Sequence, residues 1–266
     1  MQRIGVYKFP LPTTVCFACI LLCGCFPVSK PTEVPIPQRR YAAKSATQSA
    51  CLFVGLPGYG DESTKFAEED FVNTLRRASI DADFVAVDAH FGYYREGSAV
   101  ERVYHDVLLP ARQAGYQRIW VVGTSMGGAG ALGLAALQGD AVDGVLLLAP
   151  YLGDDDLIEE IRTAGGLAKW NAAIAPGVPK DKDAFFKHIW HWAKTQERQD
   201  GSKVPVYLGF GRSDDLAEPN RLLGQVLPKG RTRSIAGGHG WTVWQQLWEE
   251  FVASNALPPE CRLPQG

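Results

Sequence analysis

The stretch RIWVVGTSMGGAGALGLAAL, residues 118–137, decides the fold of this chain. Residues 119–122 are a short apolar run typical of a buried strand, and residues 127–137 are expected to form a helix. A glycine inside a helix costs about 1 kcal/mol relative to alanine, yet this helix contains Gly127, Gly128, Gly130 and Gly133. The sequence therefore predicts that the helix needs small residues where it meets its neighbours.

A serine stands at the junction between this strand and this helix. Residues 123–127 read Gly-Thr-Ser-Met-Gly, which matches the pattern G-x-S-x-G. Between a strand and a helix this pattern predicts a nucleophile elbow, a sharp and strained turn that presents the serine at the edge of the sheet. The helix N-terminus also favours negative charge that develops there. Ser125 is therefore the predicted nucleophile.

From residue 51 the chain alternates between strand and helix patterns. The expected strands are residues 51–56, 83–91, 118–122, 142–152, 204–211 and 232–237, and further helices are expected at 66–78, 100–114 and 241–255. Strands separated by helices pair in parallel with right-handed crossovers. The expected fold is therefore α/β, a mostly parallel sheet with helices on both faces. The loops that follow its strands converge on one edge, where ligands bind in such sheets.

With these elements and this motif, the chain resembles the α/β-hydrolase superfamily over residues 51–256, with reduced N-terminal strands and a small cap or none. The resemblance implies an acid and then a histidine after later strands. Asp214 ends the sequence Gly-Arg-Ser-Asp after strand 204–211, and His239 stands between glycines after strand 232–237. Asp215 remains an alternative acid, although Asp214 lies closer to the strand end.

The resemblance also implies an oxyanion hole made of two backbone N–H groups, those of Tyr59 and Met126. Tyr59 lies in the loop Leu-Pro-Gly-Tyr-Gly after the first strand. Pro57 replaces a histidine that commonly stands there in the family, which leaves the backbone role possible. The alternative is that Gly58 and Gly60 only turn the chain.

The implied activity is that of a serine hydrolase that cleaves a small-molecule carboxylic ester through an acyl-enzyme, with no cofactor and no metal ion. A thioesterase, a small lipase and a catalytically silent binding lipoprotein remain alternatives. The substrate-binding residues cannot be assigned from the sequence. His188 and His191 share a helix face, but no third ligand accompanies them. His90, at the end of an expected strand, is read as a loop residue near the site.

The net charge and the N-terminal sequence limit the binding partners and the cellular locations that are expected for the protein. The chain has 266 residues and a net charge of −2, so no basic face for nucleic acid is expected. Arg3 and Lys8 precede an apolar run, residues 15–26, which is too short to span a bilayer and reads as the core of a secretory signal.

The sequence Leu-Cys-Gly-Cys at residues 22–25 resembles the lipobox of bacterial lipoproteins. It implies a signal peptide over residues 1–24 and an acylated Cys25 that holds the protein to a membrane. Residues 25–50 are then expected to form a proline-rich tether, and residues 51–266 the hydrolase domain. The implied location is the bacterial cell envelope, at the outer membrane facing the periplasm, because Phe26 rather than aspartate follows the cysteine.

After signal removal and acylation, Cys51 and Cys261 are the two cysteines left. An even pair in an oxidising compartment is compatible with a disulfide. A buried thiol at Cys51 and an unpaired tail residue at Cys261 are the alternative, because the sequence does not give the Cα separation on which a disulfide depends.

Overall fold

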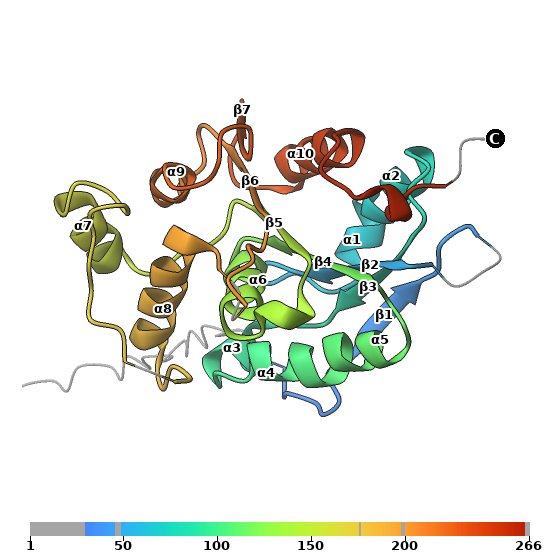
Figure 1. Ribbon diagram of the computed structural model, residues 1–266, viewed down its shortest axis with the longest axis horizontal. Coiled ribbons are helices and arrows are strands. Elements are labelled where there is room, and N and C mark those ends of the chain that lie inside the picture. The colour runs from blue at the N-terminus through green and yellow to red at the C-terminus, as the bar shows by residue number, and fades with distance from the viewer. Residues whose placement is uncertain (1–29, 46–48, 176, 198–199, 264–266) are drawn as a thin grey trace, which may run out of the picture.

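The computed structural model describes residues 30–45, 49–175, 177–197 and 200–263. The predicted signal peptide and Cys25 therefore lie outside the described residues. The fold is built on a seven-stranded sheet in the order β1-β3-β2-β4-β5-β6-β7 (Figure 1). The strands are β1 (Gln38–Tyr41), β2 (Cys51–Leu56), β3 (Ala82–Val87), β4 (Arg118–Thr124), β5 (Gly144–Leu148), β6 (Val206–Gly211) and β7 (Thr232–Ile235). Every pairing is parallel except that of β1 with β3.

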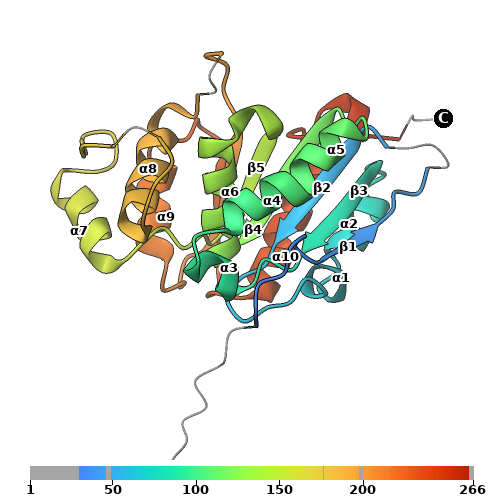
Figure 2. The same ribbon diagram turned by 90° about the horizontal axis from the view of Figure 1, so that it is seen from below.

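Helices cover both faces of the sheet, as predicted. They are α1 (Lys65–Glu68), α2 (Phe71–Arg77), α3 (Phe91–Arg95), α4 (Ala99–Val103), α5 (Leu109–Gln113), α6 (Met126–Leu137), α7 (Asp155–Thr163), α8 (Lys182–Thr195), α9 (Ala217–Gly224) and α10 (Trp241–Ala253). Helices α4, α5 and α6 lie over one face, and α2 and α10 lie over the other (Figures 1 and 2). The expected α/β architecture, a mostly parallel sheet between two helical layers, is confirmed.

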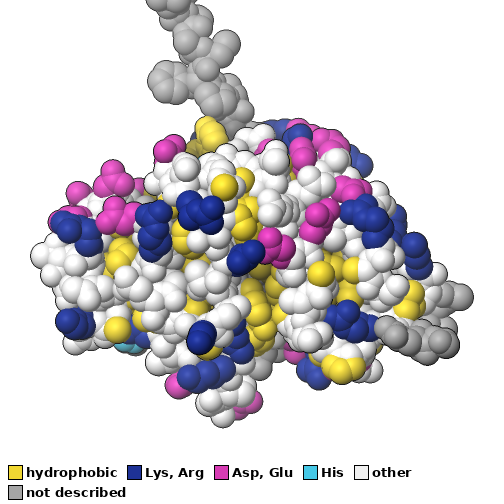
Figure 3. Space-filling model, turned by 90° about the horizontal axis from the view of Figure 1, so that it is seen from above, with side chains coloured by type: hydrophobic (Ala, Val, Ile, Leu, Met, Phe, Trp, Pro, Cys, Tyr) yellow, Lys and Arg dark blue, Asp and Glu magenta, His cyan; other side chains and the backbone are white. Residues whose placement is uncertain are grey.

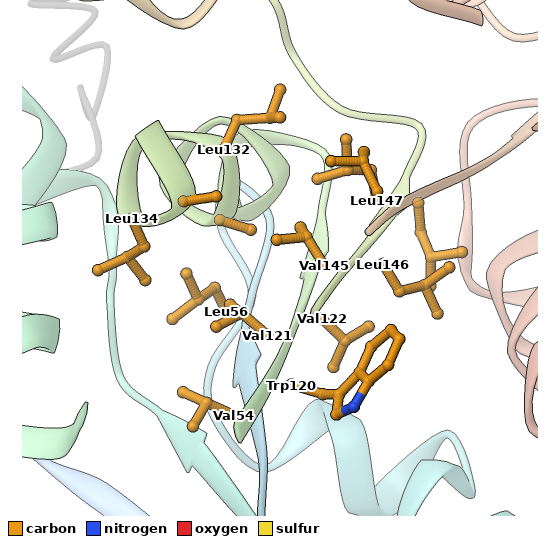
Figure 4. Close-up of a cluster of buried hydrophobic side chains, with 14 of the residues drawn as sticks. Val54, Leu56, Trp120, Val121, Val122, Leu132, Leu134, Val145, Leu146 and Leu147 are labelled. Atoms are coloured by element: carbon orange, nitrogen blue, oxygen red, sulfur yellow. The ribbon is translucent and has the colours of Figure 1, made fainter. Parts of the chain in front are cut away.

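The core lies between these layers and consists mainly of strand residues. The side chains of β2, β4 and β5 lie in one apolar cluster that spans both faces of the sheet (Figure 4). Val54, Val121 and Val145 lie on the face that α6 covers, whereas Trp120 and Leu146 lie on the opposite face, toward Phe251 of α10. Its labelled members are Val54, Leu56, Trp120, Val121, Val122, Leu132, Leu134, Val145, Leu146 and Leu147, all of them buried. Strands buried on both faces need apolar residues at every position, which explains the continuous runs in the sequence.

The glycines of α6 lie where other parts of the chain come too close for a side chain. A Cβ atom on Gly127 would lie 2.0 Å from the carbonyl oxygen of Leu56, and one on Gly128 would lie 2.6 Å from Cβ of Pro150. Gly130 and Gly133 face side chains of α3, α4 and α8 at 2.5–2.8 Å. The predicted need for small residues in this helix is confirmed, and the close approach holds the start of α6 against the ends of β2 and β5.

The predicted boundary between tether and domain at residue 51 is wrong. Residues 38–41, expected to belong to the tether, form β1 and pair antiparallel with β3. Ile36 is buried, and its backbone N–H donates to a carboxylate oxygen of Asp106 at 2.9 Å. Proline is tolerated at the start of edge strands, so the prolines that indicated a tether are compatible with this strand. The sequence of β1, Gln-Arg-Arg-Tyr, has no alternation of apolar and polar residues from which a strand could be predicted.

Several expected elements have different limits; the expected helix over residues 66–78, for example, is divided into α1 and α2. Two of the differences have clear local reasons. The expected strand over residues 83–91 ends at Val87, because His90 already caps α3 by accepting a hydrogen bond from the Gly92 N–H at 3.1 Å. The expected helix over residues 100–114 is interrupted by a π-helical turn, Tyr104–Leu108. Pro110 follows that turn, and a proline removes a helical hydrogen bond and clashes with the preceding turn.

A disulfide joins Cys51, the first residue of β2, to Cys261 near the end of the chain. The two Cα atoms are 5.4 Å apart, within the range that a disulfide requires. Both residues are fully buried. The alternative that the sequence left open, two unpaired thiols, does not describe this structure.

Removing this crosslink should lower the free energy of unfolding by about 2–5 kcal/mol, because its ends are 210 residues apart and it restricts the unfolded chain strongly. The double variant Cys51→Ala/Cys261→Ala, compared with the unmodified protein by denaturant unfolding, measures the effect. A reducing agent should lower the midpoint of the unmodified protein and leave the variant unchanged. Equal midpoints without reductant would show that the crosslink adds no stability.

Candidate active site

Ser125 occupies the predicted sharp turn between β4 and α6. Its backbone dihedral angles are φ 50° and ψ −116°, a conformation that residues with a side chain rarely adopt. Three backbone hydrogen bonds hold the turn. The Ser125 N–H donates to Leu148 at 2.9 Å, and the Ser125 carbonyl accepts from Gly128 at 3.0 Å and Tyr151 at 2.9 Å. Strain of this kind costs about 1–3 kcal/mol and persists only where the surrounding structure enforces it.

The structure brings Ser125, His239 and Asp214 together in one chain of hydrogen bonds. Nε2 of His239 lies 2.9 Å from Oγ of Ser125. Nδ1 of the same ring lies 3.0 and 2.9 Å from the two carboxylate oxygens of Asp214. The Asp214 side chain is fully buried, whereas the His239 side chain keeps 30% of its surface exposed. The three residues come from the loops after β4, β6 and β7, at the predicted edge of the sheet.

The loop after β6 fixes Asp214 for this contact. The N–H of Leu216 donates to Oδ1 of Asp214 at 2.7 Å, and the N–H of Ser213 donates to the carbonyl of Gly237 in the histidine loop at 2.9 Å. Asp215 is exposed and makes no hydrogen bond or ion pair with any described residue. Of the favoured acid, Asp214, and its alternative, Asp215, it is Asp214 that reaches the histidine.

The loop after β2 lies directly against the candidate nucleophile. A Cβ atom on Gly58 would lie 3.2 Å from Cβ of Ser125, so only glycine permits this approach without displacement. Tyr59 follows Gly58, and Met126 is the first residue of α6. Within the described residues, neither the Tyr59 nor the Met126 backbone N–H has a hydrogen-bond acceptor. Both groups predicted for the oxyanion hole are thus available as donors.

The sequence gave no indication of a contact that ties two of these loops together. Nε1 of Trp241, two residues after His239, donates to Oδ2 of Asp61 at 3.2 Å. Asp61 lies two residues after Tyr59, so this bond joins the histidine loop to the loop after β2. Burial raises the pKa of Asp61, and the Trp241 N–H and the charge of Lys65 partly oppose that rise. No local sequence pattern points to this contact, because its two residues are 180 positions apart.

The histidine ring also packs against an aromatic residue of α10. Trp244 meets the His239 ring edge-to-face, with ring centroids 5.0 Å apart. This contact restricts the plane of the imidazole while both of its nitrogens remain paired. Because the ring is held from the side, its two nitrogens point at Ser125 and Asp214 without further rearrangement.

The segment between β5 and β6 contributes two helices and no large cap. Trp170 and Trp190 are buried and pack these helices onto the domain. Phe186 instead meets Tyr151 edge-to-face at 5.3 Å, and Tyr151 donates its backbone N–H to the Ser125 carbonyl. Lys182 bonds Asp154 at 2.8 Å and lies over the Tyr151 ring. Tyr151 therefore links this corner of the segment to the serine turn.

None of the other histidines contacts Ser125 or Asp214 in the part of the chain that the structure describes. His90 caps α3, as described above. The described ranges contain no cluster of three or more histidine, cysteine, aspartate or glutamate side chains that could hold a metal ion. None of the helices in those ranges is both long and apolar enough to cross a membrane.

A hollow of about 300 Å³ lies between β6, β7 and α10, away from the serine. Tyr207, Leu247 and Phe251 contribute to its apolar walls, and Arg231 and Arg233 lie at its border. Figure 3 shows the side of the molecule that carries α9, β7 and α10, where apolar side chains line a furrow. No candidate site residue lines this hollow, so the site at Ser125 is a separate feature.

Comparison with known proteins identifies the family of this chain. The Esterase family model, described as "Putative esterase", matches residues 108–253, which is more than half of the chain and includes Ser125, Asp214 and His239. Among curated proteins, none matches the chain.

Solved structures resemble the fold at low sequence identity. Est1E from Butyrivibrio proteoclasticus with bound ferulic acid is 16% identical, with a TM-score of 0.57, covering 82% of this chain and 92% of that chain. FphF, a fluorophosphonate-binding serine hydrolase of Staphylococcus aureus, is 15% identical, with a TM-score of 0.55, covering 85% and 95%. A ferulic acid esterase is 16% identical, with a TM-score of 0.56, covering 82% and 96%.

These solved structures share the fold of this chain, and the match to the Esterase model shows its family. The parallel sheet, the strained serine turn and the family match together make this protein a serine hydrolase with the α/β-hydrolase fold that belongs to the Esterase family.

Proposed function

We propose that Ser125, His239 and Asp214 form a catalytic triad that cleaves carboxylic esters through an acyl-enzyme. The observation that carries the proposal is the continuous chain of contacts from the buried Asp214 carboxylate through His239 to Oγ of Ser125. A nucleophile, a base and a group that orients the base are the parts that acyl transfer requires.

In the first half of the reaction, Nε2 of His239 takes the proton of the Ser125 hydroxyl while Oγ attacks the ester carbonyl carbon. Asp214 accepts a hydrogen bond from Nδ1–H and stabilises the imidazolium that forms. The N–H groups of Tyr59 and Met126 donate to the tetrahedral oxyanion. His239 then protonates the leaving alkoxide, and the alcohol departs from the acyl-enzyme.

In the second half, a water molecule attacks the acyl-enzyme carbonyl while His239 takes a proton from that water. The tetrahedral intermediate collapses, the carboxylic acid leaves, and Ser125 regains its proton from His239. Thioesters and lipid esters fit the same steps, so the reaction class is acyl-ester hydrolysis and the alcohol and acyl groups are set by the surrounding surface.

A fluorophosphonate probe tests the proposal, because it reacts with a serine only where a base activates that serine. We expect the folded protein to be labelled on the peptide that contains Ser125 and the heat-unfolded protein to remain unlabelled. Chromogenic esters of increasing acyl length, a feruloyl ester and a thioester then rank the substrates by kcat/KM. Measured ester hydrolysis with labelling at another serine would contradict the triad.

We further propose that Cys25 carries lipid and holds the enzyme at the outer membrane of a bacterial envelope, facing the periplasm. The lipobox pattern at residues 22–25 supports this location. The disulfide between Cys51 and Cys261 is compatible with it, because disulfides persist in oxidising compartments.

Replacing Cys25 with serine should abolish labelling by a palmitate analogue in cells and leave an unprocessed precursor, because the serine hydroxyl cannot accept the thioether-linked lipid. Cys23→Ser is the matched control, since it changes a neighbouring cysteine that the proposal does not acylate. Gel mobility and fluorescence of the palmitate analogue report both results. Persistent labelling of the Cys25 variant would place the lipid elsewhere.

A further inference from the structure

Two exposed aromatic rings stand beside the candidate nucleophile. Tyr59 is 59% exposed and Phe91 is 39% exposed, and their rings meet edge-to-face with centroids 5.1 Å apart. Tyr59 directly follows Gly58, which contacts Ser125. Among the described residues, the other large apolar side chains exposed to this degree are Val34 and Val178. Exposed apolar residues that cluster, as this pair does, mark a contact surface more often than scattered ones do.

The described part of the chain begins next to this pair. Nζ of Lys30 lies 2.5 Å from a carboxylate oxygen of Glu62, in the loop after β2. A Cβ atom on Gly92, the neighbour of Phe91, would lie 2.9 Å from the Lys30 carbonyl oxygen. Figures 1 and 2 both show the start of the described chain beside α3. The N-terminal segment therefore enters the domain at the same corner as the aromatic pair.

The length of chain that precedes this point limits how far the proposed anchor can lie from the domain. Cys25 stands five positions before Lys30. Five residues span at most about 18 Å when fully extended. A globular domain of this length has a radius of gyration of about 18 Å and is therefore roughly 45 Å across. Lipid on Cys25 would thus keep this corner of the domain near the bilayer, whereas the opposite side would lie much farther away.

From this placement we propose that the Tyr59–Phe91 pair, together with the exposed face of α3, contacts the surface of the phospholipid bilayer. The inference rests on the proposed acylation of Cys25. Aromatic rings are favoured at the boundary between lipid and water. The charges at this corner are of mixed sign, with Lys30 paired to Glu62 and with exposed Arg95 and Glu96 adjacent at the end of α3, so the two aromatic rings supply the attraction to lipid. The active site then opens toward the membrane, and its substrates are esters of amphiphiles that reside there.

Site-directed fluorescence on the acylated protein tests this orientation. With Cys25 acylated and Cys51 paired to Cys261, an introduced cysteine is the one free thiol of the processed chain. A nitrobenzoxadiazole fluorophore is attached to the variants Phe91→Cys and Arg95→Cys. Arg95 is exposed one turn farther along α3, so it keeps the test valid if the change at Phe91 disturbs the fold. The matched control is Asp140→Cys, exposed just before β5 at the opposite edge of the sheet.

The acylated proteins are mixed with vesicles of phosphatidylethanolamine and phosphatidylglycerol and recovered by flotation. We expect labels at positions 91 and 95 to shift to shorter emission wavelength and to be quenched by spin-labelled phospholipid, and the label at position 140 to do neither. Vesicle-bound protein with all labels in water, or with position 140 quenched equally, would overturn the orientation alone. Acylated protein that does not float would overturn the lipid anchor and this surface together. Neither result depends on catalysis, so the triad is tested separately.

Discussion

Ser125→Ala should lower kcat for ester hydrolysis by at least about 10³-fold while leaving the fold intact. The variant lacks the single oxygen that attacks the carbonyl, and the remaining contacts can bind substrate but cannot form the acyl-enzyme. Alanine and serine both carry a Cβ atom, so the strain at φ 50° is the same in both proteins. Initial rates with a saturating chromogenic ester give kcat, and thermal unfolding checks that stability is unchanged.

Thr124→Val is the matched control for this prediction. Thr124 is buried next to Ser125, and its hydroxyl oxygen has no hydrogen-bond partner among the described residues. Its replacement by valine removes a neighbouring hydroxyl of no catalytic role, so kcat should stay close to that of the unmodified enzyme. If Ser125→Ala retained full turnover in a preparation free of other esterases, Ser125 could not be the nucleophile.

Asp214→Asn should lower kcat by about 10⁴-fold, the loss found when the orienting aspartate of a serine protease is changed to asparagine. The amide preserves the size of the side chain and can still accept the hydrogen bond from the Leu216 N–H. It cannot stabilise the imidazolium as a carboxylate does, and its NH₂ group favours the wrong tautomer of His239. The pH dependence of kcat/KM, with kcat itself, separates this loss from a change in substrate binding.

Asp215→Asn provides the comparison, because Asp215 is adjacent, exposed and without a described partner. Its substitution should change kcat less than about twofold, as expected for an exposed acid that does not contact the histidine. Collapse of activity in the Asp215 variant with near-normal activity in the Asp214 variant would move the acid by one residue. Normal activity in both would place the orienting group elsewhere.

The fold could be predicted because the strongest signals were local. The apolar run at residues 51–56 has the same limits as β2, and G-x-S-x-G between a strand and a helix predicted a turn with the observed geometry. Strand β1 escaped detection because its polar residues make only one edge pairing and leave no alternating pattern. Apolar periodicity indicates burial, whereas β1 is held by its backbone pairing with β3 and by the ion pair of Arg40 with Asp83.

The candidate site was likewise predicted only in part from the sequence. His239 and Asp214 could be predicted because each follows an expected strand, in the order that the resemblance implies. The choice between Asp214 and Asp215 depended on the direction of the turn, which the Leu216 N–H and the Ser213–Gly237 bond determine. The bond between Asp61 and Trp241 joins residues 180 positions apart, and no local pattern encodes such a contact.

The glycines of α6 restrict how this enzyme can be engineered for heat tolerance. Exchanging glycine for alanine commonly stabilises a protein by about 0.4–1 kcal/mol, because the unfolded chain loses conformational freedom. At Gly127 and Gly128 the new methyl group would meet backbone or proline atoms within 2.6 Å, so the same exchange would push the serine turn out of place. A mutational library aimed at thermostability should therefore leave this helix untouched and draw its substitutions from the solvent-facing positions of α7 and α9.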